Sequence, residues 1–69
     1  MDVVLVFPSN SGTMIATQTL RNSGVPARMI PTPPGAHSPS SLCLSVDGAV
    51  ESKAVTALKA ANVSVSVYR

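Results

Sequence analysis

Residues 3–12 read VVLVFPSNSG, and this stretch decides how the rest of the chain is interpreted. The five residues at its start are all apolar and mostly β-branched, and Pro8 ends the run. A short run of this kind is typical of a buried central strand. The polar residues that follow, Ser9, Asn10 and Ser11, can cap a helix. We therefore expect a strand over residues 3–7 that leads directly into a helix over residues 13–22.

Four further elements are predicted from the spacing of the apolar residues. Residues 25–30 and 42–46 alternate in side-chain character as strands do, and residues 63–67 alternate valine with serine. In residues 49–61 apolar side chains recur at intervals of three and four, which is typical of an amphipathic helix. Gly24, Gly48 and Asn62 stand where these elements begin or end.

The resulting order, β-α-β-β-α-β, is the signature of a ferredoxin-like α+β sandwich. Right-handed crossovers place the four antiparallel strands in the order 4-1-3-2, with both helices on one face of the sheet. Residues 1–69 then form a single domain. The opposite face has no helix of its own, so outward side chains such as Val4, Val6 and Cys43 are expected to be exposed or covered by a partner.

Composition narrows the class of protein. Of the 69 residues, 45% are hydrophobic and only 12% are charged, so some apolar surface is expected to face a partner protein or a second copy. The net charge of +2 contains no basic run, and Phe7 and Tyr68 are the only aromatic residues, which argues against nucleic-acid binding. A single cysteine favours the cytoplasm, and no segment approaches the roughly 20 apolar residues of a membrane span.

The predicted topology brings two polar segments to the same end of the sheet. One is the start of the first helix, and the other is the proline- and serine-rich loop over residues 31–41. The candidate site formed there comprises Pro8, Ser9, Asn10, Ser11, Thr32, Pro33 and His37. Free N–H groups of the helix could hold a small anion, with Arg28 approaching them. Simple helix capping accounts for the same residues, and a histidine in such a loop is commonly only solvated.

Neither a catalytic nor a metal site is predicted. Asp2, Asp47 and Glu51 fall in a terminus, a turn and a helix, so no paired carboxylates are available for acid–base chemistry. One histidine and one cysteine do not provide the three or four ligands of a metal site, and no cofactor is expected. Cys43 is the one nucleophile candidate. Its alternative role is that of a small buried apolar residue.

Three segments also resemble a known family. They are FPSNSG over residues 7–12, NSGVPARMIPTP over residues 22–33, and the last strand with Tyr68. Together they resemble the family named putative selenium/sulfur (Se/S) carrier protein-like, over nearly the whole chain. The resemblance implies handling of sulfur or selenium by a thiol, with a donor protein as a partner. Such a thiol near the start of the first helix would have a lowered pKa, because the helix N–H groups and dipole stabilise the thiolate.

The resemblance places the family's Cys-Gly pair on Ser40 and Ser41 when residues are counted forward from Pro33 without a gap. Cys43 then lies three positions further on, within the third strand. On this alignment the carrier thiol of the family is absent. A slip of two or three residues in the loop would bring Cys43 nearer to the family position, at the expense of the strand pattern of Leu42, Leu44 and Val46.

Two functions remain open from the sequence. The first is a non-enzymatic accessory protein whose Cys43 carries sulfur or selenium and is presented by the loop over residues 31–41. The second is a small binding or assembly subunit that docks on a larger protein through the open sheet face or the proline-rich loop. Reactivity of Cys43 separates the two.

Overall fold

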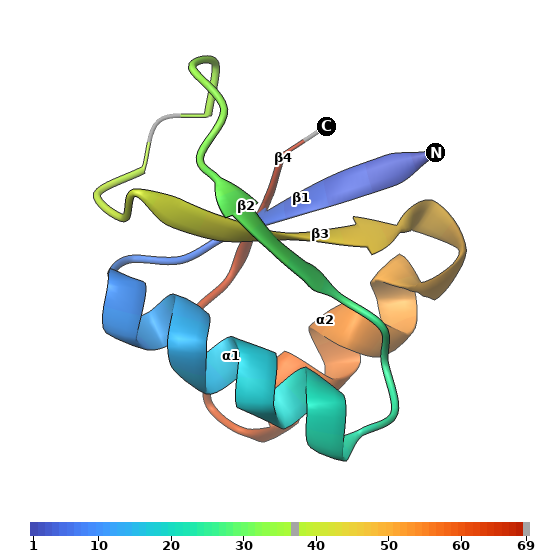
Figure 1. Cartoon of the computed structure of the whole chain (residues 1–69). Helices are drawn as coiled ribbons and strands as arrows, with labels where there is room; N and C mark the ends of the chain where they lie inside the picture. Colours follow the sequence, from blue (N-terminus) through green and yellow to red (C-terminus); the bar gives the residue numbers. More distant parts are fainter. Residues whose placement is uncertain (37, 69) are drawn as a thin grey trace.

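The computed structural model describes residues 1–36 and 38–68 of the chain, and Figure 1 shows its layers. Its elements follow the predicted order, with one additional short 3-10 helix, η1, before the second α-helix. In chain order they are β1 (Asp2–Val6), α1 (Asn10–Asn22), β2 (Arg28–Pro31), β3 (Leu42–Asp47), η1 (Gly48–Val50), α2 (Glu51–Ala60) and β4 (Ser66–Tyr68).

The four strands form one antiparallel sheet in the order β2-β3-β1-β4, which is the predicted order 4-1-3-2 read from the other edge. Strand β1 lies between β3 and β4, as a buried apolar run requires. Both helices lie below the sheet in Figure 1. The prediction of a small α+β fold with ferredoxin-like strand order is therefore confirmed.

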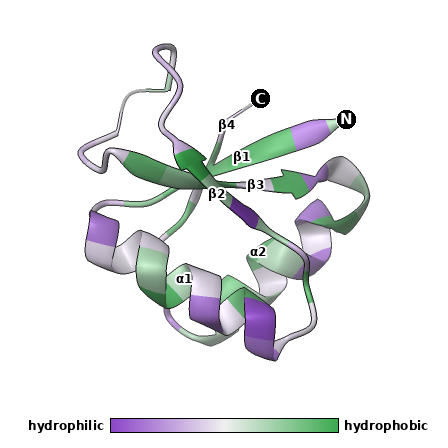
Figure 2. Cartoon of the chain, in the orientation of Figure 1, coloured by the Kyte–Doolittle hydropathy of each residue, from purple (hydrophilic) through white to green (hydrophobic). Residues whose placement is uncertain are grey.

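The core lies between the sheet and the two helices. Leu5 and Phe7 from the first strand segment pack there with Leu44 of β3, and Leu20 and Leu58 contribute from the helices. All five side chains are almost completely buried. Figure 2 shows the apolar residues concentrated in β1 and β3, the two inner strands. Burial of these side chains supplies the main driving force for a chain of this size.

Helix α1 begins three residues earlier than predicted. The Ser9 side chain accepts a hydrogen bond from the Gly12 N–H over 3.1 Å, so Ser9 is the N-cap and the helix starts at Asn10. A serine in this position satisfies one of the free N–H groups at the helix start. Three of the candidate residues of the site, Pro8, Ser9 and Ser11, are exposed around this cap.

Strands β2 and β4 begin three residues later than predicted, for one shared reason. The N–H of Val25 donates to the Leu20 carbonyl and that of Val63 to the Leu58 carbonyl, each over 2.9 Å. Each bond closes the end of its helix just after a residue with a positive φ angle. At the end of α2 this residue is Asn62. The residues after each helix therefore complete the helix cap before the strand can start.

The loop between β2 and β3 covers part of the sheet face opposite the helices. We call residues 32–36 and 38–41 the strap, which rises above the sheet in Figure 1. Ala36 in the strap is only 6% exposed, while Val6 and Cys43 on the sheet face are 8% and 0% exposed. Thr32 of the strap is a hydrogen-bonding neighbour of the Cys43 thiol, and Ala36 lines the same hollow as Val6, so the strap contributes to this burial. The expectation that Val6 and Cys43 are exposed or need a partner is wrong.

Candidate functional site

The strap ends against the start of α1, as the topology predicted. The Asn10 side-chain oxygen accepts hydrogen bonds from the N–H groups of Ser41 and Leu42, over 3.0 and 3.2 Å. The Asn10 amide nitrogen donates to the Ser41 hydroxyl over 3.1 Å. One helix-end side chain thus fixes the point at which the strap becomes strand β3.

Hydroxyl groups hold the rest of this junction together. The fully buried Thr13 hydroxyl donates to the Leu42 carbonyl over 2.9 Å, and the Ser38 hydroxyl donates to the Phe7 carbonyl over 3.0 Å. Within the strap, the Thr32 hydroxyl donates to the Ser40 carbonyl over 3.0 Å. These bonds tie the strap both to itself and to the end of β1.

Ser40 and Ser41, the positions onto which the resemblance places the family's Cys-Gly pair, lie in this junction. Ser40 is only 4% exposed, and its hydroxyl donates to the Leu42 carbonyl over 2.8 Å. Ser41 is exposed, with its hydroxyl held by Asn10. A neutral hydroxyl that donates to a carbonyl is not an activated nucleophile, because no base accepts its proton. These two serines are therefore hydrogen-bonding groups of the closed strap.

We predict that Asn10→Ala lowers the free energy of unfolding by about 1–3 kcal/mol, because it leaves two strand N–H groups without their acceptor. Chemical unfolding of the variant measures this loss. The matched control is Asn22→Ala, which removes only an exposed contact with Gln18 at the other end of α1 and is expected to change stability by less than about 0.5 kcal/mol. Equal losses in the two variants would contradict the role given to Asn10.

Cys43 lies in the interior of β3 on the strap side of the sheet. Its sulfur is within 3.6 Å of the Ile30 carbonyl oxygen and 3.7 Å of the Pro31 carbonyl oxygen, both in β2. Burial raises the pKa of the Cys43 thiol, and a hydrogen bond with Thr32 lowers it by a smaller amount. The thiolate is the reactive form of cysteine. In the closed structure Cys43 is thus a protonated, inaccessible thiol.

The raised pKa of Cys43 predicts that stability falls as pH rises above the ordinary thiol value of about 8.5. In that window the unfolded chain loses the Cys43 proton while the folded chain keeps it, so the free energy of unfolding decreases by up to about 1.4 kcal/mol per pH unit. Below that window both states keep the proton. Urea unfolding of wild type and Cys43→Ala from neutral to alkaline pH measures the effect. An equal decline in both proteins would contradict it.

The remaining predicted residues divide into those the structure brings together and those it does not. Thr32 and Pro33 are half-buried in the strap, while His37 lies outside the described residues. In the register of β2 and β3, Arg28 lies opposite Ser45. This position is three residues from the Pro31–Leu42 pair, which stands at the end of the sheet beside α1. The predicted approach of Arg28 to the helix start is therefore wrong, because Arg28 stands at the far end of β2.

Thr13 and Ser38 are the site residues that the sequence analysis missed. Both make hydrogen bonds to residues about 30 positions away in the chain. No local pattern distinguishes a threonine or serine with such a partner from one that faces water. Among residues 1–36 and 38–68, no group of three or more His, Cys, Asp or Glu side chains could hold a metal ion.

The structure defines a class: a small antiparallel α+β domain with a polar strap and a single, buried thiol. A family model described as "Putative Se/S carrier protein-like" matches residues 2–69, and the chain belongs to that family. The resemblance noted in the sequence is thereby confirmed. No curated protein and no solved structure shows a significant match to the chain. No helix within the described residues has the length and apolar character needed to span a bilayer.

Proposed function

We propose that this protein is a non-enzymatic accessory member of the Se/S carrier-like family that acts by binding a partner protein. In this role it carries no sulfur or selenium on a thiol while the strap is closed. The observation that supports the proposal most strongly is the complete burial of Cys43, the only cysteine of the chain. A buried thiol with a raised pKa can neither meet a sulfur donor nor attack it.

Exposed apolar side chains support the binding role. Met14 and Ile15 on α1 are 63% and 57% exposed, and Met29 at the sheet edge is 43% exposed. We infer that these exposed apolar side chains contribute to a surface that contacts another protein. Methionine is also common on surfaces that adapt to a partner, because its side chain is unbranched and flexible.

Uptake of sulfur tests the thiol part of the proposal. Native protein is incubated with inorganic polysulfide and its intact mass is measured. We expect wild type to stay unmodified and Ser52→Cys, which adds a thiol at an exposed position of α2, to gain sulfur. Complete sulfur uptake by wild type at the rate of the control would contradict the proposal.

The binding part is tested with the double variant Met14→Glu/Ile15→Glu. Proteins that co-purify with the tagged chain from its own cells are identified by mass spectrometry and then titrated against purified wild type and variant. We expect the variant to lose affinity for a partner that wild type binds directly. Equal binding by both proteins would show that these residues of α1 do not form the surface.

A gated carrier is the second candidate function, and membership of the family favours it. Here the strap opens on a donor protein, the Cys43 thiolate attacks the outer sulfur of the donor's persulfide, and the donor leaves as a thiolate. Cys43 then holds the persulfide. This function is supported if polysulfide leaves wild type unmodified while a persulfide-bearing donor protein transfers sulfur to Cys43, and not to Cys43→Ala.

A further inference from the structure

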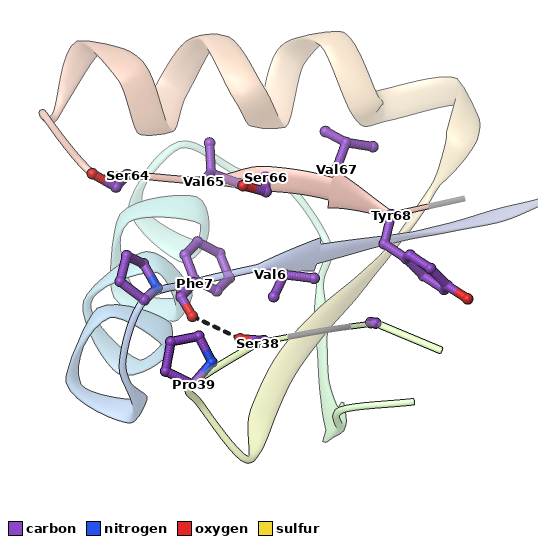
Figure 3. Close-up of a pocket in the computed structure, with 11 residues that line it drawn as sticks. Val6, Phe7, Ser38, Pro39, Ser64, Val65, Ser66, Val67 and Tyr68 are labelled. Carbon is purple, nitrogen blue, oxygen red and sulfur yellow. Dashed lines mark hydrogen bonds between the residues drawn. The ribbon is translucent and has the colours of Figure 1, made fainter. Parts of the chain in front are cut away.

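A hollow of about 420 Å³ lies between the strap and β4, on the side of the sheet away from the helices. Figure 3 shows Val6 and Phe7 between Ser38 and Pro39 of the strap and the last strand segment. Three distant parts of the chain therefore wall the same space. Its volume is within the range of about 300–1,000 Å³ that is usual for small-molecule sites.

The chemistry of the walls is uniform. Of the described residues that line the hollow, none carries a charge, and most are apolar: Val6, Phe7, Pro8, Ala36, Pro39, Val65 and Val67. The polar groups are hydroxyls. Those of Ser64, Ser66 and Tyr68 make no hydrogen bond with any other described residue, whereas the Ser38 hydroxyl is bonded to Phe7. Three hydroxyls are thus available beside an apolar floor.

Tyr68 gives the hollow its outer wall. Its side chain projects from the same face of β4 as Ser66, opposite to Val67 (Figure 3). At Gly35 in the strap, an added Cβ would collide with the Tyr68 hydroxyl group. The absence of a side chain at Gly35 lets the tyrosine lie against the strap, so the ring bridges the two sides of the hollow.

We propose that this hollow binds an uncharged small molecule that has an apolar, ring-sized body and at least one hydrogen-bonding group. The apolar floor takes the body, and the hydroxyls of Ser64, Ser66 and Tyr68 orient it. A charged ligand is disfavoured, because most of the described lining residues are apolar and a charge loses hydration against them. This site is independent of the thiol and goes beyond the proposed function.

Occupation of the hollow also holds the strap shut. The ligand contacts Ala36 and Pro39 of the strap on one side and β4 on the other, so it binds only the closed form. A ligand that binds only one of two states stabilises that state by RT ln(1 + L/Kd), where L is the free ligand concentration. Alkylation of Cys43 requires the open form, since the thiol is fully buried in the closed one. Ligand binding is therefore expected to slow this reaction.

Indole is the test probe, with indole-3-acetate as its charged counterpart. Amide chemical shifts of the labelled full chain are recorded as each is added. We expect indole to shift the amide signals of Val6, Phe7 and residues 64–68 with millimolar affinity, and indole-3-acetate to bind more weakly. At indole concentrations ten times its dissociation constant, alkylation of Cys43 by iodoacetamide is expected to slow about tenfold.

Ser66→Phe fills the hollow from an exposed position of β4 and is expected to abolish the indole shifts. Ser52→Phe on α2 is the matched control and is expected to keep them. Circular dichroism confirms that both variants are folded. The proposed site would be overturned if indole caused no shifts or shifted residues over the whole surface. It would also be overturned if Ser66→Phe showed the same indole shifts as wild type. Localised binding with unchanged alkylation of Cys43 would overturn the coupling to the strap.

Discussion

Phe7→Ala is expected to remove about 3–5 kcal/mol from the free energy of unfolding. Phe7 is 1% exposed and is among the largest fully buried side chains of the core. A chain of this length has a total stability of only about 3–10 kcal/mol, at roughly 0.05–0.15 kcal/mol per residue. The variant is therefore expected to be largely unfolded, or to unfold at much lower denaturant concentration.

Urea unfolding followed by circular dichroism measures the effect of Phe7→Ala. The matched control is Met14→Ala, which removes an apolar side chain that is 63% exposed and is expected to change stability by less than about 0.5 kcal/mol. A loss below about 1 kcal/mol in Phe7→Ala would mean that the core is not organised around the end of β1.

Ala36→Asp is expected to open the strap and to raise the alkylation rate of Cys43 roughly 10- to 100-fold, while the sheet and helices stay folded. Ala36 is 6% exposed in the strap, so a carboxylate there must leave its buried position to reach water. Side-chain hydrogen bonds of Ser38 and Asn10 join the strap to the end of the first strand segment and to α1. Opening therefore exposes the thiol without unfolding the core.

Alkylation by iodoacetamide, followed by mass spectrometry, measures the opening of the strap. Ala49→Asp makes the same substitution at an exposed position and is expected to leave the rate unchanged. If both variants react as slowly as wild type, the strap is not what protects Cys43. If circular dichroism shows that Ala36→Asp has lost its helices, Ala36→Ser provides a milder test, with a smaller increase in rate expected.

The fold could be predicted because its deciding elements are local patterns. The apolar run of β1 ends at Pro8, and the helix stripe that contains Ala54 and Leu58 repeats at the helical period. These features fix the element order, and the order fixes the sheet. The starts of β2 and β4 were predicted too early, since the bonds from Val25 and Val63 to the helix ends depend on cap geometry that apolar alternation does not reveal.

The candidate site could be predicted only in part. The predicted topology was sufficient to place the loop between β2 and β3 beside the start of α1. The alternation of side chains along β3 was sufficient to put Cys43 on the sheet face opposite the two helices. The path of the strap could not be predicted, because prolines and serines carry no periodicity. Its position depends on bonds to Phe7 and Asn10, about 30 residues away. The burial of Cys43 follows from that path.

We infer that the strap seals Cys43, the only thiol of the chain. The direct measurement is the rate at which Cys43 reacts with iodoacetamide in the native protein, compared with the rate in denaturing urea. With an opening free energy of about 3 kcal/mol, the native rate is expected to be roughly 100-fold lower. A native rate within a few-fold of the denatured rate would contradict the claim and would restore Cys43 as an accessible carrier thiol.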